Sequence, residues 1–230
     1  MQTLLNRGAG NIFLPTVQHT GTWFGLNLLY AHSQVSCVLD GGITLFSNHG
    51  LLYKNRMVVQ THIGEGNDPI EWEKMIQFAG ISPVISTVRD PLAALITRQT
   101  RHPEMSHWCI IDGFLNLIHF TEVQDVFILP VDLYAAKPVE ERLAFLHKLL
   151  EFVGLPSESY IFLWALAWPV HNTTPEGPGG ILHSSYIAGD LGPIIQAMPE
   201  EYEYLKSQEG ILKPFLQRQG YENLIWWEKE

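Results

Sequence analysis

Short apolar runs, each closed by a turn of small or polar residues and followed by a helical stretch, recur along this chain and constrain its fold more than any other feature. The first run covers residues 12–15, its turn covers 18–22, and a helix is expected from Trp23 to about Ala31. A second unit of the same kind has its run, turn and helix at 83–88, 89–91 and 92–101. Alternating strands and helices are typical of a parallel sheet covered on both faces. We therefore predict an α/β fold of three layers, with a central, mainly parallel sheet flanked by helices.

The remaining elements follow from the same periodicity. Strands are predicted at 57–59 and 126–129, and helices at 72–78, 105–120, 138–153, 199–208 and 214–220, with a pause at Gly210 between the last two. Residues 168–193 contain many glycines and prolines, which predicts a long loop or lid without regular structure. Ligands of parallel sheets bind at the carboxyl ends of the strands, so a site is expected at the turns 18–22 and 89–91.

Composition bounds the class of protein. Of the 230 residues, 46% are hydrophobic and 17% are charged, which excludes disordered, collagen-like and polyelectrolyte chains. This length fits a single α/β domain spanning residues 1–230. The 14 basic and 24 acidic side chains give a formal net charge of −10. Because that charge repels a phosphate backbone unless basic residues cluster, no nucleic-acid partner is expected.

Cysteine content and the apolar runs bear on the compartment. Cys37 and Cys109 are too few for a disulfide framework or a zinc ribbon, and we expect both to be buried as small apolar residues. The first residues lack the basic start and apolar stretch of a secretory signal, and no run of about 18 apolar residues occurs. The expectation is a soluble, cytoplasmic protein without a membrane partner.

The turn Gln18-His19-Thr20-Gly21-Thr22 is a candidate anion cradle. Backbone N–H groups at a helix N-terminus point at a bound anion, the helix dipole favours negative charge, and small residues let a phosphate approach. The alternative is an ordinary turn in which Thr20 or Thr22 caps the helix. The chain has no GxxxxGK followed by Ser or Thr, which disfavours an ordinary nucleoside-triphosphatase loop.

The residues on either side of this turn carry a resemblance. Phe13-Leu14-Pro15 precedes it and Trp23-Phe24 follows it. The whole segment is similar to the 5′-phosphosulfate loop of the sulfotransferase family, approximately Pro-Lys-Ser-Gly-Thr-Thr-Trp between the first strand and first helix. The resemblance implies a domain of the P-loop type, in which Phe24 matches the adenine-packing tryptophan more nearly than Trp23 does. The donor contacts that it implies come from His19, Thr20, Gly21, Thr22, Trp23 and Phe24.

A second match lies at Val88-Arg89-Asp90-Pro91, with Thr97 eight residues after Arg89. It resembles the 3′-phosphate site of the same family, in which an arginine closes a strand and a hydroxyl residue lies in the following helix. Arginine supplies a planar fork of donors, and threonine supplies one more. The alternative is a surface turn with a local ion pair. Arg98 and Arg101 extend a positive pocket in one interpretation and are solvated helix residues in the other.

A third match is the run Val58-Val59-Gln60-Thr61-His62, which resembles the family's strand ending in Lys-Thr-His. The histidine of that strand is the general base in many members, which makes His62 the candidate base here. A histidine has an ordinary pKa of about 6.5, which suits proton acceptance near neutrality. Among ten histidines, a structural or merely exposed role is the alternative.

The resemblance continues in order to the end of the chain, through Val131-Asp132-Leu133, Gly154-Leu155-Pro156, Gly189-Asp190-Leu191 and Tyr221-Glu222. It also has departures. His19 replaces the loop lysine, which would bring a permanent charge to the sulfuryl oxygens. Gln60 stands at the position of the lysine before Thr-His, and no basic run occupies the C-terminal loop.

The resulting interpretation is a sulfotransferase that moves the sulfuryl group of 3′-phosphoadenosine 5′-phosphosulfate to a hydroxyl or amine of a small molecule or glycan. His19 and the backbone of 19–22 would hold the phosphosulfate, His62 would deprotonate the acceptor, and no metal is needed. The acceptor pocket is expected around 168–193, with Trp164, Trp168 and His171 beside it or in it. The alternatives are a non-catalytic nucleotide-binding protein of the same fold and a small-molecule kinase.

Overall fold

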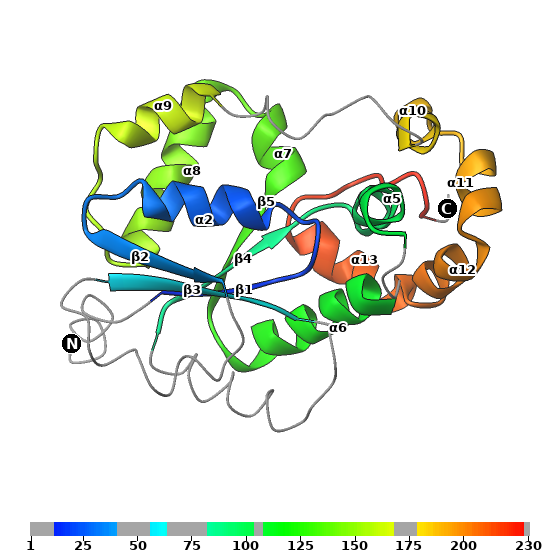
Figure 1. Cartoon of the computed structure of the whole chain (residues 1–230), viewed down its shortest axis with the longest axis horizontal. Helices are drawn as coiled ribbons and strands as arrows, with labels where there is room; N and C mark the ends of the chain where they lie inside the picture. The colour runs from blue at the N-terminus through cyan, green and yellow to red at the C-terminus, as the bar shows by residue number, and fades with distance from the viewer. Residues whose placement is uncertain (1–11, 41–55, 64–81, 104–107, 168–178, 228–230) are drawn as a thin grey trace.

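The centre of the molecule is a sheet of parallel strands, seen edge-on in Figure 1. The computed structural model describes residues 12–40, 56–63, 82–103, 108–167 and 179–227. Within these residues the sheet has five strands in the order β2-β3-β1-β4-β5, and every neighbouring pair is parallel. The strands are β1 (Ile12–Thr16), β2 (Val35–Asp40), β3 (Arg56–His62), β4 (Val84–Val88) and β5 (Val126–Pro130). Sequence analysis did not predict β2; the other four strands are confirmed.

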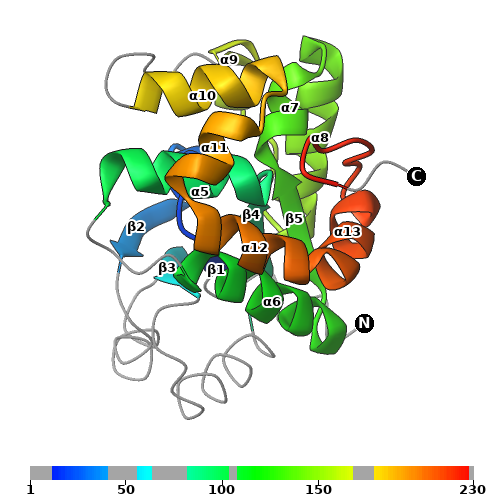
Figure 2. The ribbon, with the colours of Figure 1, turned by 90° about the vertical axis from the view of Figure 1, so that its right-hand side faces the viewer.

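Helices cover both faces of this sheet, which confirms the predicted three-layer α/β fold. Figure 1 shows α2, α8 and α9 on one side and α6 on the other, and Figure 2 shows α10 to α13 following one another past α5 toward α6. The helices are α2 (Thr22–Tyr30), α5 (Pro91–Arg101), α6 (Trp108–Val123), α7 (Val131–Ala136), α8 (Val139–Phe152), α9 (Tyr160–Ala167), α10 (Gly179–Ala188), α11 (Gly192–Ala197), α12 (Pro199–Ser207) and α13 (Glu209–Arg218).

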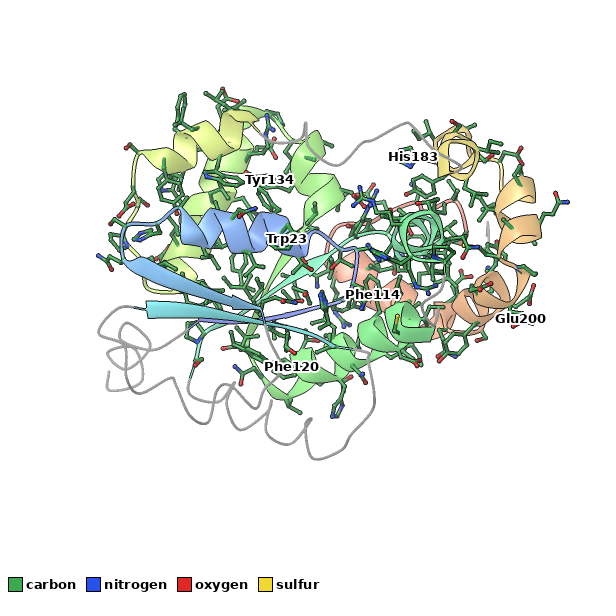
Figure 3. All side chains as sticks on the ribbon, in the orientation of Figure 1. Trp23, Phe114, Phe120, Tyr134, His183 and Glu200 are labelled. Carbon is green, nitrogen blue, oxygen red and sulfur yellow. The ribbon has the colours of Figure 1, made fainter. Side chains whose placement is uncertain are left out.

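Strand β1 shows how the two faces are built. Ile12 and Leu14 belong to the apolar core on the α2 and α8 side, whereas Phe13 between them belongs to the core on the α6 side. All three side chains are fully buried, as expected for a central strand whose successive residues point to opposite faces. Phe13 meets Phe120 of α6 with ring centroids 6.2 Å apart, and Figure 3 shows Phe120 beneath the sheet.

The prediction that 168–193 is a loop without regular structure is wrong for residues 179–193, which contain α10 and the start of α11. The glycines and prolines there mark helix ends. Gly189 adopts a left-handed φ of 72°, and its amide and that of Asp190 donate to carbonyls in the last turn of α10. Asp190 then accepts a hydrogen bond from the amide of Gly192, and Pro193 lies in the first turn of α11.

The predicted pause between the last two helices lies at Gln208 and not at Gly210. Gly210 lies in the first turn of α13, and Pro214 lies inside the same helix. Gly210 is exposed, so water can satisfy the carbonyl that loses its usual partner to the proline. The short helices α7 and α9 were not predicted, and the predicted helix at 72–78 lies outside the described residues.

The register of the three central strands positions their carboxyl ends side by side. Thr16 at the end of β1 is paired with His62 at the end of β3, and Phe13 is paired with Val84 of β4. The segments that follow these strands therefore emerge at one edge of the sheet. That edge is where ligands of parallel α/β sheets bind.

No helix among the described residues is both long and apolar enough to cross a lipid bilayer. That the whole of residues 1–230 forms a single domain stays a prediction.

The close approach of α6 to the end of β3 gives a test of the packing. A Cβ at Gly113 would lie 2.5 Å from the carbonyl oxygen of Ile63, whereas a Cβ at Gly210 meets nothing within 4 Å. Gly113→Ala should lower the free energy of unfolding by about 2 kcal/mol through overpacking. Gly210→Ala should leave it unchanged or raise it by up to about 1 kcal/mol. Urea denaturation of both variants measures this, and equal stabilities would contradict the packing.

Candidate functional site

A cavity of about 310 Å³ lies at the carboxyl ends of β1, β3 and β4. Its size is within the range of small-ligand sites. It gathers residues from all three matched motifs, although they are up to 80 positions apart in the chain. The lining residues are Gln18, His19, Gly21, Thr22, Trp23, Leu26, Gln60, His62, Arg89, Thr97, Arg101 and His102.

The turn before α2 has the backbone of an anion cradle. Gly21 is the N-cap of α2 with a left-handed φ of 98°, and no side chain caps the helix. A Cβ at Gly21 would lie 2.7 Å from a methyl group of Val131, so glycine is required there for conformation and for space. The Phe24 N–H donates to the Gly21 carbonyl at 3.0 Å. The N–H groups of Thr22 and Trp23, the first two residues of α2, have no partner within the helix, and both residues line the cavity.

The threonines of the turn do not cap the helix, contrary to the simpler interpretation of the sequence. The Thr20 hydroxyl donates to the carbonyl of Val17 at 2.7 Å and lies 3.1 Å from the Thr87 hydroxyl of β4. The Thr22 hydroxyl donates to the Thr16 hydroxyl at 3.1 Å. Both side chains therefore fasten the turn to the strands, and the helix N-terminus stays open to a ligand.

Of the two aromatic residues after the turn, Trp23 lies at the cavity and Phe24 does not. The Trp23 side chain is 68% exposed and lines the cavity, whereas Phe24 is 3% exposed. Phe24 packs against Tyr134 and Trp164, with ring centroids 5.6 and 5.5 Å away. Figure 3 shows Trp23 on α2. The structure therefore corrects the expectation that Phe24 is the closer match to an adenine-packing residue, since the exposed ring belongs to Trp23.

His19 occupies the position of the family's loop lysine and has a special environment. Its backbone has a positive φ of 59°, and its ring stacks on His102 with centroids 5.7 Å apart. Burial, followed by the nearby His102, Arg101 and Arg98, lowers the pKa of His19 to about 4. At neutral pH this side chain is uncharged, so it does not supply the positive charge of a lysine unless a bound anion raises its pKa.

The two arginines that follow Thr97 differ in their surroundings. Arg98 is fully buried in the last turn of α5, so the interpretation of Arg98 as a solvated helix residue is wrong. Arg101 is exposed and lines the cavity.

Arg89 and Thr97 meet directly at the cavity. Nη1 of Arg89 donates to the Thr97 hydroxyl at 3.1 Å, and that hydroxyl donates to the Ala93 carbonyl one turn earlier. Nε of Arg89 pairs with Oδ1 of Asp132 at 3.1 Å. The predicted ion pair in this turn therefore involves Asp132 of α7 and not the adjacent Asp90. The guanidinium is held from two sides before any ligand is bound.

His62 closes β3 at the cavity. Its Nδ1 lies 3.5 Å from the Thr16 hydroxyl, and the ring is half-buried. The same hydroxyl accepts a hydrogen bond from Nε2 of Gln60 at 3.0 Å. Gln60 therefore supports the strand ends and brings no charge to the cavity.

Asp90 is a residue at this edge that sequence reasoning did not select. It is 1% exposed and accepts three hydrogen bonds, from the Tyr186 hydroxyl at 2.6 Å, from Nε1 of Trp226 at 2.8 Å and from the amide of Leu92 at 2.9 Å. Burial raises the pKa of Asp90 to about 6, against the opposing effect of these donors. An Asp directly before a proline at the start of a helix is a recognisable capping signal, but its distant partners are not.

In the part of the chain that the structure describes, no group of three or more His, Cys, Asp or Glu side chains is placed to hold a metal ion. Trp164 belongs to the core beside Phe24, and Trp168 and His171 lie outside the described residues. Cys109 is buried, as expected for a small apolar residue, and its thiol donates to Oε1 of Gln18 at 3.8 Å.

Comparison with known proteins adds a likeness of shape. No family model matches the chain, and no curated protein matches its sequence. Among solved structures, the crystal structure of mouse sulfotransferase SULT7A1 complexed with PAP is similar over 76% of this chain and 74% of that chain. The sequence identity is 12% and the TM-score is 0.49. At this level the likeness concerns the fold alone.

The buried carboxylate of Asp90 gives a test of this edge. Asp90→Ala leaves three buried donors without an acceptor and should lower the free energy of unfolding by about 3 kcal/mol or more. Asp90→Asn keeps an oxygen for the Leu92 and Trp226 donors and an amide opposite the Tyr186 oxygen. It also removes a buried charge, so the expected change at pH 7 is within about 1 kcal/mol.

The pH dependence has a definite sign. Because the folded pKa of Asp90 is about 6 and its ordinary value is 3.8, the folded protein takes up a proton that the unfolded chain does not bind. Its contribution to stability therefore rises as the pH falls through 6. The stability of the parent relative to Asp90→Asn should increase between pH 7 and pH 5 in denaturation experiments. A difference that does not vary with pH would contradict a titrating Asp90.

Proposed function

We propose that this cavity binds 3′-phosphoadenosine 5′-phosphosulfate and that the protein transfers the sulfuryl group to a hydroxyl or amine of a small molecule or glycan. The observation that carries the proposal is the convergence of three separate motifs on one cavity. The cavity is lined by His19, Gly21 and Thr22 of the turn, by His62, and by the pair Arg89 and Thr97. Each motif is modest alone, and only their meeting gives a site with two anion-binding ends.

The first end is the N-terminus of α2. The uncapped amides of its first turn and the left-handed Gly21 leave space and donors for the 5′-phosphosulfate. Trp23 presents an exposed ring next to this turn, which suits stacking on a flat base.

The second end is the guanidinium of Arg89. Asp132 holds Nε, and Thr97 accepts from Nη1, so the plane of the fork is set in advance. A preorganised fork loses little conformational entropy when it binds a phosphate, and its geometry matches two phosphate oxygens. This end would take the 3′-phosphate.

The chemistry that follows is an in-line displacement. The acceptor oxygen or nitrogen forms a bond to sulfur as the bond from sulfur to the 5′-phosphate oxygen breaks. His62 takes the proton of the acceptor, and adenosine 3′,5′-bisphosphate leaves. As in phosphoryl transfer, the protein contributes positioning and charge stabilisation.

A second candidate is a non-catalytic protein that binds the same nucleotide. The lowered pKa of His19 favours it, because an uncharged side chain stands where a permanent positive charge would meet the sulfuryl oxygens. The two candidates share the binding site and differ in turnover.

Binding is tested by thermal unfolding with adenosine 3′,5′-bisphosphate. At about 100 times its Kd, the ligand should add about 2.7 kcal/mol of stability, which for a chain of this size raises Tm by roughly 5–10 °C. Arg89→Lys keeps the charge but loses the fork, so most of the shift should disappear. Arg218→Lys, an exposed position in the last turn of α13 that does not line the cavity, should keep the full shift. No shift in the parent at millimolar ligand would refute the proposal.

Turnover is tested by assaying sulfate transfer to a panel of hydroxyl and amine acceptors. For a transferase, the parent should be active, His62→Ala should lose about 10²-fold or more of kcat, and His19→Lys should raise kcat. The protein would be a non-catalytic binder if the parent binds the bisphosphate but transfers no sulfate, and if His19→Lys also shows no transfer that depends on His62.

A further inference from the structure

Two carboxylates, Asp90 and Asp132, lie between the cavity and the C-terminal part of the chain. Neither lines the cavity. Asp132 is in the first turn of α7, directly after β5, and Asp90 is the N-cap of α5. Both carboxylates are therefore close to Arg89 but outside the cavity that it lines.

The first link joins Arg89 to both carboxylates. Oδ1 of Asp132 pairs with Nε of Arg89 at 3.1 Å, and Oδ2 of Asp132 accepts the backbone amide of Asp90 at 3.1 Å. Asp132 is thus bound to the side chain of one residue of the turn and to the backbone of the next. A shift of the turn shifts the guanidinium with it.

The second link joins the turn to two residues that lie 96 and 136 positions after Asp90 in the chain. The carboxylate of Asp90 accepts the hydroxyl of Tyr186 from α10 and Nε1 of Trp226 from the last described residues. The same carboxylate caps α5 through the amide of Leu92, and α5 carries Thr97. Both members of the pair Arg89 and Thr97 are therefore attached to the C-terminal segments through Asp90.

A third aromatic residue lies near the same carboxylates. Tyr221 is 3% exposed, and burial and the charges of Asp132 and Asp90 raise the pKa of its hydroxyl. Two polar aromatic side chains, Tyr186 and Trp226, thus donate to Asp90, and a third is buried near it. Such a cluster is more than an N-terminal cap for α5 requires, because a single Asp satisfies the cap.

We propose that Tyr186 and Trp226 are positioning residues for the 3′-phosphate site: through the hydrogen bonds of Asp90 and Asp132, the docking of α10 and the C-terminal residues sets the orientation of Arg89. The inference rests on the proposed function of the cavity. It adds that segments outside the cavity control the orientation of Arg89. The recognition of the 3′-phosphate then depends on whether the C-terminal part of the chain is docked.

The test compares two nucleotides that differ only in the group that Arg89 would bind. Calorimetry measures the Kd of adenosine 3′,5′-bisphosphate and of adenosine 5′-monophosphate for the full chain. The Kd of the monophosphate divided by the Kd of the bisphosphate isolates the contribution of the 3′-phosphate. Tyr186→Phe and Trp226→Phe each remove one donor to Asp90 and should lower this ratio by about fivefold. Affinity for the monophosphate should change by less than about twofold, since its phosphate lies at the other end of the cavity.

Tyr204→Phe is the matched control. The Tyr204 hydroxyl of α12 donates to Oδ1 of Asp112 at 2.6 Å, the same kind of bond and the same length as that from Tyr186 to Asp90. Asp112 has no contact with Arg89 among the hydrogen bonds and ion pairs of the described residues. The ratio should stay at the parent value in this variant.

The outcomes separate the inference from the proposed function. A lowered ratio in Tyr186→Phe and Trp226→Phe, with the parent ratio in Tyr204→Phe, supports the positioning role. An unchanged ratio in all variants of a parent that prefers the bisphosphate overturns this inference and leaves the proposed function standing. An equally lowered ratio in Tyr204→Phe also overturns it, because the loss of a tyrosine hydrogen bond remote from Arg89 would then have the same effect on binding. A parent without affinity for the bisphosphate overturns the proposed function and this inference together.

Discussion

The parallel register of β1, β3 and β4 is the constraint on which the rest of this molecule depends. It places Thr16 beside His62 and aligns the start of β4 with β1, so the segments after all three strands leave at one edge. Main-chain hydrogen bonds set this alignment, and the apolar side chains on both faces hold it, because a slip by one residue would turn each buried side chain to the opposite face. The cavity is a consequence of that alignment.

Three arginines, Arg89, Arg98 and Arg101, lie near this edge. Arg89 is paired with Asp132, and burial together with neighbouring cations keeps His19 uncharged near neutral pH. The protein as a whole is acidic, whereas Arg89 and Arg101 bring positive charge to the cavity. Under the proposed function, neutral backbone amides at the start of α2 would have a larger part in anion binding than they would beside a loop lysine. The identity of residue 19 would then matter for turnover.

The C-terminal third of the chain contacts the residues beside the cavity, and its sequence does not predict these contacts. Glycines and prolines around 189–193 predict irregular backbone, yet they end α10, which lies against α5, and begin α11. Through Tyr186 and Trp226 these segments reach Asp90, whose burial makes each donated hydrogen bond costly to lose. We infer that this carboxylate, which does not line the cavity, helps to position Arg89.

The sequence alone determined the alternation of strands and helices, and with it the layered α/β architecture and the edge at which a site would form. Local patterns suffice for this, because periodicity and turn residues act within a few positions. It also singled out the turn at 19–22, His62 and Arg89 with Thr97. Tertiary structure alone decided that Trp23 and not Phe24 faces the cavity, that Asp132 and not Asp90 pairs with Arg89, and that β2 joins the sheet. Each of these depends on packing between segments far apart in the chain, where burial and neighbouring charges are set by the fold as a whole.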